Sequence, residues 1–495
     1  MCRIFAILNF TEFCGDQIRD AITTMEMWKG NLPTLGPISS WRSAYLPPLY
    51  FYFVFPFTAI SSDLSSQAIF NGITTFFSIP LLMFTIYQSL EKVESNKRFF
   101  LATLAGLWYS LLFQNIVMNT GNSLAGNPGS VVFFLLAFIL LFTYILEDKL
   151  SSIKECLFWL AYGFCFVSLI NLQFAPLFVM PVIFMISIFI YLYKNRKNPQ
   201  KFILPCLAIL TVLIALTPYW FGEIERNWLN SKEILALVFK TGEEPKYSMS
   251  FFQRLIAVIR GYFDIGKDGY FIGTSRLTKL ISILFMGVIL LFGILKYRGN
   301  QTIYYLWLMI SLVFLYAYSS VNMQNTYNPL FYRLLIYLVP IFLTIWCLAY
   351  LNFSSRSEKL IIIFLAFSIT FCILINLKFH YNYITARVGM PRVQNTTDLV
   401  QIVREIPNQA TVCDAINYYR NLRIYEYIDR YITQKKIQFI GECYPTNYLI
   451  YQKYLSHPRT YRLINNKPIS EIEPKFTYPY HLYKETPLFY IYQID

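Results

Sequence analysis

The chain of 495 residues has few charged residues. Only 14% are Asp, Glu, Lys or Arg, whereas 56% are hydrophobic and 19% are aromatic. Soluble domains contain about 25% charged residues, so this shortage excludes an ordinary soluble protein. The uncharged runs are about 20 residues long, which is enough for a helix to cross a membrane. The sequence therefore predicts an all-α polytopic membrane protein.

Motifs of several common enzyme classes are also missing. The chain has three histidines, and its nine cysteines form no CxxC pair, so zinc-site and haem-attachment spacings are absent. No GxGxxG, GxxxxGK[ST] or GxSxG motif occurs, which leaves nucleotide-dependent chemistry and serine hydrolysis without support. No motif requires a cofactor, and the sequence does not decide whether a divalent metal takes part.

The hydrophobic runs predict ten membrane spans. They are 66–90, 98–118, 129–147, 152–171, 173–193, 202–220, 277–296, 301–319, 330–351 and 358–378. Ten spans put both chain ends on the same, outer side, so an eleventh helix is expected ahead of Asp16. Residues 1–10 look like its last turns, and we expect a truncated or mis-started first helix.

Lys and Arg gather in every second short loop. The basic loops are 91–98, 147–155, 194–201, 296–300 and 354–359, whereas loops 119–128, 171–175 and 320–329 have neither residue. Basic loops face the cytoplasm. Most of the net charge of +14 lies in these loops and the tail, so we predict no nucleic-acid partner. Residues 46–62 cannot cross without inverting this pattern, which favours an interfacial or half-inserted helix.

This orientation divides the chain into three parts. Residues 1–65 would hold the truncated helix and the first extracytoplasmic loop, 66–378 the transmembrane domain with an outer loop at 221–276, and 379–495 an extracytoplasmic C-terminal domain. The polar, Tyr-rich tail predicts a small α/β domain, with helices near 396–406 and 418–433 and strands at 410–413, 438–441 and 488–494. Outside the cytoplasm, Cys413 and Cys443 could form a disulfide.

The opening stretch, residues 15–57, carries two acids at a membrane boundary. Asp16 and Asp20 are four residues apart and share one face of a short helix. The apolar side of that helix would hold Ile18, Ala21, Ile22, Met25 and Trp28. In one interpretation Asp16 is a general base. In the other it caps the helix, and Arg19 and Asp20 are solvated charges.

Other polar residues lie at the outer ends of spans. Arg333 would be costly there unless it bound an anion such as phosphate, or reached the interface as an anchor. Glu223 and Glu225 follow a span and would hold a substrate or cation, or belong to a solvated loop. Asn127 precedes a span and would start a helix or line a site.

The opening stretch resembles the first extracytoplasmic loop of GT-C glycosyltransferases, in the protein O-mannosyltransferase and aminoarabinose-transferase-like superfamily. The matching residues are Gly15-Asp16-Gln17-x-Arg19-Asp20, Gly30-Asn31-Leu32-Pro33, Leu35-Gly36-Pro37-x-Ser39 and Leu46-Pro47-Pro48-Leu49-Tyr50-x-Tyr52. Weaker matches are Asn127-Pro128, Pro218 to Glu223, and Tyr332-Arg333 leading into Pro340. Gln17 stands where the family often has a second acid, which puts metal use there in question.

The resemblance implies a GT-C-like enzyme of the bacterial inner membrane. It would move a sugar from a polyprenyl-phosphate donor to a lipid, glycan or protein acceptor by one inverting displacement. Asp16 would be the base and Arg333 would bind the donor phosphate. The residues that would line the site are Arg19, Asp20, Tyr50, Asn127, Glu223 and Tyr332.

Two other classes of protein stay open. A transporter or flippase would need many spans, but the chain has no internal repeat and its charges cluster at one membrane face. A polysaccharide polymerase or ligase would share the lipid donor and the large outer loop. The Asp-Gln-x-Arg-Asp block near the start of the chain argues against this class.

Overall fold

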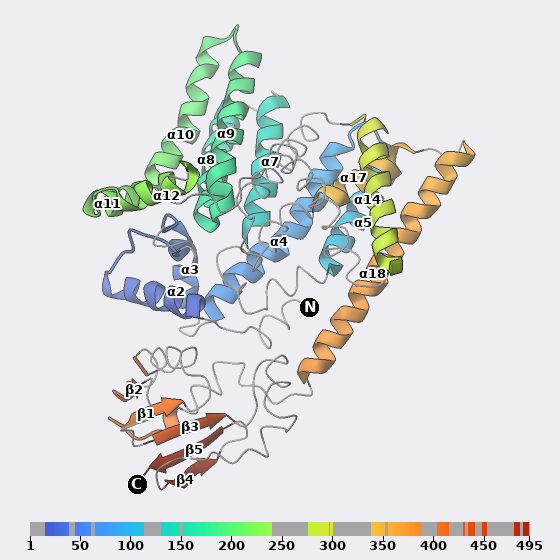
Figure 1. Ribbon diagram of the computed structural model, residues 1–495. Coiled ribbons are helices and arrows are strands. Elements are labelled where there is room, and N and C mark those ends of the chain that lie inside the picture. Colours follow the sequence, from blue (N-terminus) through green and yellow to red (C-terminus); the bar gives the residue numbers. More distant parts are fainter. Residues whose placement is uncertain are drawn as a thin grey trace.

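The computed structural model of the protein describes residues 15–38, 45–60, 65–112, 130–147, 152–239, 276–296, 298–299, 338–351, 355–388, 403–414, 429–430, 434–440, 448–452, 480–485 and 489–494. Within these ranges the chain forms a helical bundle, and short strands lie beyond one end of it (Figure 1). The bundle contains α4 (Ser65–Ser89), α5 (Ser95–Leu111), α7 (Val131–Glu147), α8 (Ser152–Leu172), α9 (Phe174–Lys194), α10 (Leu204–Ala215), α14 (Arg276–Lys296), α17 (Leu338–Tyr350) and α18 (Arg356–Val388).

Several of these helices are long and apolar enough to cross a membrane. Among the described residues α4, α8, α14 and α18 qualify, and a fifth span is formed if the bent pair 199–215 and 217–225 is one crossing. Each predicted span overlaps one of the bundle helices except 301–319, which lies outside the described residues. The protein is therefore a multi-pass membrane protein, as the sequence predicts.

The predicted span at 202–220 is not one straight helix. It comprises η3 (Pro199–Ile203), α10 and α11 (Thr217–Glu225), with a bend of 48° before α11. Pro218 lies in the first turn of α11, where its missing N–H costs nothing and its fixed φ favours a new helix start. Helix α11 therefore lies across the end of the bundle.

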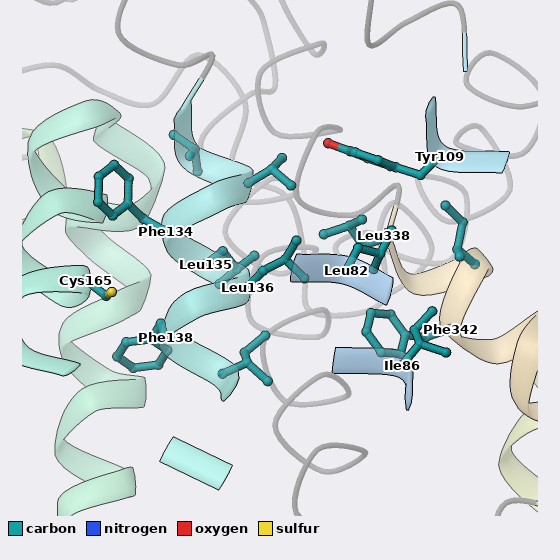
Figure 2. Close-up of a cluster of buried hydrophobic side chains, with 14 of the residues drawn as sticks. Leu82, Ile86, Tyr109, Phe134, Leu135, Leu136, Phe138, Cys165, Leu338 and Phe342 are labelled. Atoms are coloured by element: carbon teal, nitrogen blue, oxygen red, sulfur yellow. The ribbon is translucent and has the colours of Figure 1, made fainter. Parts of the chain in front are cut away.

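The core of the bundle is aliphatic and aromatic. Buried side chains from α4, α5, α7, α8 and α17 meet in its centre (Figure 2). The Phe138 and Tyr162 rings stack with centroids 4.3 Å apart, and Trp108, Trp159 and Trp346 are almost completely buried. Close packing of large rings makes this part of the chain a stiff frame.

Helix α4 carries a buried polar stripe along one face. Its members recur at helical spacing and are Gln67, Asn71, Thr74, Ser78, Thr85 and Ser89. The Ser89 hydroxyl accepts a hydrogen bond from Trp346 Nε1 (2.9 Å), and Ser130 before α7 contacts Asn71 Oδ1 (2.9 Å) and Thr74 Oγ1 (2.7 Å). The stripe therefore ties α4 to α7 and α17.

The opening stretch forms two short helices at one end of the bundle. They are α2 (Gly15–Glu26), which continues into η1 (Met27–Lys29), and α3 (Leu49–Thr58). Gly30 ends η1 with φ of +88°, a conformation that glycine adopts readily. Ten residues of α3 measure about 15 Å, half of a hydrocarbon core of about 30 Å. Helix α3 alone does not cross the membrane, in agreement with the sequence prediction for 46–62.

The C-terminal part contains one sheet of five strands: β1 (Thr411–Asp414), β2 (Gln438–Ile440), β3 (Tyr448–Gln452), β4 (Tyr480–Glu485) and β5 (Phe489–Ile494). Their order is β2-β1-β3-β5-β4. Strand β1 is parallel to β2 and β3, whereas the β3–β5 and β4–β5 pairs are antiparallel.

The sequence predicts β1, β2 and β5 at these positions but not β3 and β4. The two predicted tail helices lie mostly outside the described residues, so the separate α/β domain stays a prediction. Cys413 lies in β1, but Cys443 is outside the described residues, and the disulfide is likewise untested.

Candidate functional site

The candidate site is formed where α2 and α3 meet the end of the bundle (Figure 1). Trp28 Nε1 donates to Thr58 Oγ1 (2.9 Å), and the Trp28 ring lies 4.8 Å from that of Phe55. Asn171 of α8 accepts from the backbone N–H of Leu49 (3.0 Å). Helix α8 therefore fixes the start of α3, and α3 in turn holds the end of α2.

The loop between α2 and α3 closes on itself at Gly36. The Gly36 N–H donates to Leu46 O (2.7 Å), and the Leu46 N–H donates to Pro37 O (3.0 Å). Ile38 and Tyr45 form an antiparallel bridge beyond this crossing. The two arms of the loop thus lie side by side, and Gly36 is at a point where their backbones approach closely.

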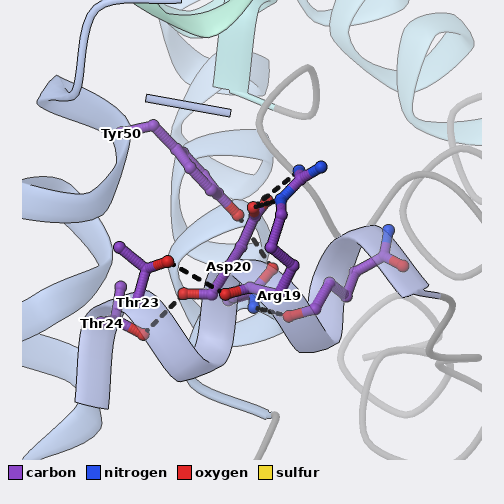
Figure 3. A network of polar contacts seen from close by, with 7 residues as sticks. Arg19, Asp20, Thr23, Thr24 and Tyr50 are labelled. Carbon is purple, nitrogen blue, oxygen red and sulfur yellow. Dashed lines mark hydrogen bonds and ion pairs between the residues drawn. The ribbon is translucent and has the colours of Figure 1, made fainter. Parts of the chain in front are cut away.

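Asp20 is buried in the site beside Arg19 and Tyr50 (Figure 3). Its Oδ1 atom accepts from Arg19 Nε (2.9 Å) and Nη2 (2.8 Å). Burial and the negative charge of Asp20 raise the pKa of the Tyr50 hydroxyl, so Tyr50 stays neutral at physiological pH. The expectation that Asp20 is solvated is wrong, because α2 turns this side of the helix toward α3.

The apolar side predicted for α2 is only partly its buried side. Ile18 and Ala21 are buried, but Trp28 is 55% exposed. Polar residues complete the buried side of α2: Gln17, Asp20 and Thr24. The helix is therefore not a simple amphipathic helix, since its buried side contains polar as well as apolar side chains.

Asp16 lies one turn before Asp20, about 6 Å along the helix axis. Helix α2 already includes Gly15, so Asp16 lies within the helix and is not the residue that precedes it. The helix-cap interpretation is therefore wrong. The Asp16 side chain is outside the described part of the structure, so its role as a base stays a prediction.

Glu223 is a buried helical residue and not part of a solvated loop. It lies in α11 and is 0% exposed, whereas Glu225 is exposed. Glu223 Oε2 accepts from the Ser231 N–H (2.8 Å). The Tyr219 hydroxyl lies close enough to interact electrostatically with the Glu223 carboxylate. Within the described residues, no donor forms a hydrogen bond of ordinary geometry with the buried Oε1 atom of Glu223.

Helices α11 and α12 (Leu229–Phe239) hold the loop that follows α2. Asn230 Oδ1 accepts from the Tyr45 N–H (2.5 Å), and Asn230 Nδ2 donates to Tyr45 O (3.0 Å) and to Tyr219 Oη (2.8 Å). Asn227 and Trp228 have φ of 54° and 61°, left-handed values that turn α11 sharply into α12. Sequence reasoning missed Asn230, because nothing in the local pattern distinguishes it.

The structure therefore brings together Arg19, Asp20 and Tyr50, and it buries Glu223 in a helix that touches the same loop. A Cβ atom on Gly222 would lie 2.8 Å from Thr34 Oγ1, which shows how closely α11 approaches that loop. Asn127, Tyr332 and Arg333 lie outside the described residues. The described part has no group of three or more His, Cys, Asp or Glu side chains arranged to hold a metal.

No protein-family model and no curated protein sequence matches the chain. Among solved structures, ArnT from Cupriavidus metallidurans bound to undecaprenyl phosphate aligns with a TM-score of 0.52 and 10% identity, over 99% of this chain and 95% of that one. ArnT in the apo state gives 0.51 and 11% over the same shares. The chain has the fold of ArnT.

ArnT is a GT-C glycosyltransferase, so the GT-C-like helical fold that the sequence predicts is confirmed. The archaeal oligosaccharyltransferase AglB from Archaeoglobus fulgidus, in complex with an inhibitory peptide and a dolichol-phosphate, aligns less well. Its TM-score is 0.42 at 11% identity, over 91% of this chain and 69% of that one.

Asp20→Asn is expected to lower the melting temperature of the purified protein. The substitution removes the charge that Arg19 binds, and a hydrogen bond to a charged group contributes about 1.5–3 kcal/mol. Because Arg19 is partly exposed, we expect a loss near the lower end. The exposed Glu225→Gln is the control and should change nothing. An unchanged melting temperature for Asp20→Asn would contradict a structural role for the Arg19–Asp20 pair.

Proposed function

We propose that the protein is an integral membrane glycosyltransferase that uses a polyprenyl-phosphate sugar as its donor. The observation that carries the proposal is the ArnT fold over 99% of the chain. The compared ArnT structure holds undecaprenyl phosphate, a lipid phosphate of the donor class. A loop with an acid-bearing helix at one end of the bundle suits transfer to an acceptor at the membrane surface.

In the proposed mechanism Asp16 takes the proton of an acceptor hydroxyl as that oxygen attacks the anomeric carbon. The bond from this carbon to the phosphate oxygen breaks, and the lipid phosphate leaves with the bonding electrons. Arg333 stabilises the departing phosphate with its guanidinium group. A single displacement inverts the sugar configuration. We assign the base to Asp16 because the resemblance of the opening stretch to GT-C glycosyltransferases aligns this residue with their catalytic aspartate.

We also propose that the site faces the outside of a bacterial inner membrane. Helices α2, α3, α11 and α12 lie at the end of the bundle opposite the loop that joins α9 to η3 (Figure 1). That loop and the helix ends beside it carry Lys194, Arg196, Lys197 and Lys201, and such a cluster of basic residues is typical of a cytoplasmic loop. Arg430 pairs with Glu26 of α2 at 3.0 Å, which supports an extracytoplasmic tail.

The proposal is tested with purified protein in liposomes that contain polyprenyl-phosphate sugars and candidate acceptors. We expect released polyprenyl phosphate and an acceptor that gains one sugar, both measured by mass spectrometry. A flippase would move the labelled lipid between leaflets without releasing polyprenyl phosphate from the sugar. A polymerase or ligase would transfer a multi-sugar chain. Either result would overturn the assignment.

Arg333→Ala is expected to raise the KM for the lipid-linked donor by about 10–100-fold. The variant loses a charge-assisted hydrogen bond to the donor phosphate, and such bonds contribute about 1.5–3 kcal/mol. Initial rates over a range of donor concentrations measure the effect. Lys197→Ala, at the end of the bundle opposite α2 and α3, is the control. Equal donor dependence in Arg333→Ala and wild type would contradict the role of Arg333.

A further inference from the structure

A buried amide on α4 connects both α2 and α3 of the opening stretch to the bundle. Gln67, in the first turn of α4, is 0% exposed. Its Nε2 atom donates to the backbone carbonyl of Gln17 in α2 (2.6 Å), and its Oε1 atom accepts from the Tyr50 hydroxyl of α3 (3.1 Å). Gln67 is 50 residues from Gln17 and 17 from Tyr50, so only the folded bundle brings the three together.

We propose that Gln67 is a positioning residue of the transferase site, which fixes the turn of α2 that carries Asp16. This inference rests on the proposed function. Gln17 directly follows Asp16, so a donor bound to the Gln17 carbonyl restrains the backbone beside the base. The same amide accepts a hydrogen bond from the Tyr50 hydroxyl, which lies next to Asp20 and also interacts with Asn71.

The chemistry of this position favours an amide over other side chains. An amide donates to the Gln17 carbonyl and accepts from the Tyr50 hydroxyl at the same time. An ionised carboxylate accepts only, and leucine does neither. Leucine would fill the space without the cost of burying a polar group, so packing alone does not explain a glutamine here.

Gln67 can act as a reference point because its own helix is held firmly. One turn farther along α4, Asn71 accepts from the hydroxyl of Ser130, the residue directly before α7 (2.9 Å). Thr74, on the same stripe, contacts Ser130 Oγ (2.7 Å). Helix α2 is only 12 residues long. The stiff bundle therefore restrains the short helix α2.

Two substitutions test the proposal. Gln67→Leu removes both hydrogen bonds, and we expect kcat to fall about 10–100-fold with little change in the donor KM, because small displacements of a catalytic group are costly. We also expect amide hydrogen exchange across residues 15–26 to become about 10-fold faster, since the turn loses its restraint.

Gln67→Glu should give partial rescue that depends on pH. The protonated carboxyl group donates to the Gln17 carbonyl and accepts from Tyr50, whereas the ionised group repels that carbonyl. Activity relative to wild type is therefore present below the pKa of the introduced carboxyl group and is lost as the pH rises through it. A disturbance of packing alone would give no such dependence.

The matched control is Gln88, on the same helix but near its other end. Its Nε2 atom donates to the Tyr144 hydroxyl of α7 (3.0 Å), so Gln88→Leu breaks a comparable bond away from the site. In this variant we expect kcat and the rate of amide hydrogen exchange in α2 to equal the wild-type values. If Gln67→Leu leaves both kcat and α2 exchange unchanged, the proposal is overturned. If the wild type transfers no sugar, the proposed function fails. The rate of amide hydrogen exchange in α2 then tests by itself whether Gln67 restrains this helix.

Discussion

Asp16→Asn is expected to abolish sugar transfer while the protein stays folded and inserted. Asparagine has the size of aspartate but cannot take a proton from the acceptor hydroxyl. A positioned general base contributes about 10²–10⁴-fold to the rate, so the variant should retain at most about 1% of wild-type activity. Release of polyprenyl phosphate from liposomes measures the loss.

The interpretation of that result depends on a comparison with Asp20→Asn. Both substitutions change one carboxylate on the same helix. Asp20 is buried against an arginine, so Asp20→Asn should lower the melting temperature. The role proposed for Asp16 is catalytic, so Asp16→Asn should leave the melting temperature unchanged. Unchanged transfer by Asp16→Asn would remove the assigned base and with it the proposed mechanism.

Gly36→Ala is expected to open the loop of the site and to reduce transfer about 100-fold. A Cβ atom at Gly36 would lie 2.2 Å from Pro47 O and 2.7 Å from Leu46 O. These are backbone atoms and cannot swing aside, so the two arms of the loop must separate. The hydrogen bond from the Gly36 N–H to Leu46 O would then break. A displacement of about 1 Å near a catalytic group is enough for such a loss.

The control for this substitution is Gly287→Ala in α14. A Cβ atom there has no heavy atom within 4 Å, so the same chemical change meets open space. Alanine also favours a helix over glycine by about 1 kcal/mol, so the melting temperature should stay or rise. Melting temperatures and transfer rates of both variants are to be compared. A Gly36→Ala protein with wild-type transfer would show that the crossing at Gly36 does not shape the site.

The helices were predictable because the signal for each is local. A run of apolar residues identifies a span whatever it packs against, and even the break before α11 has a local cause in Pro218. Helix α18 runs to Val388, past the predicted end at 378, because no glycine or proline interrupts it before Gly389.

The interior of the site was not predictable in the same way. The sequence indicates that Asp16 and Asp20 share a helix, but burial of Asp20 depends on how α2 packs against α3. Glu223 looked like a solvated residue because it follows a span, yet α11 buries it. Pairing of Asn230 with Tyr45 joins residues 185 positions apart, and no periodicity in a single sequence reports such a contact.

The polar stripe of α4 has a consequence for the order in which the protein assembles in the bilayer. The hydroxyls of Thr74, Ser78 and Thr85 donate hydrogen bonds to carbonyls one turn earlier in their own helix. These hydroxyls are therefore satisfied without a partner helix when α4 first enters the lipid bilayer. The amides of Gln67 and Asn71 instead find partners on other segments. Insertion of α4 can therefore precede docking, and these amides are satisfied only when α2, α3 and Ser130 arrive. The end of the molecule that contains α2 and α3 is then completed after the rest of the bundle.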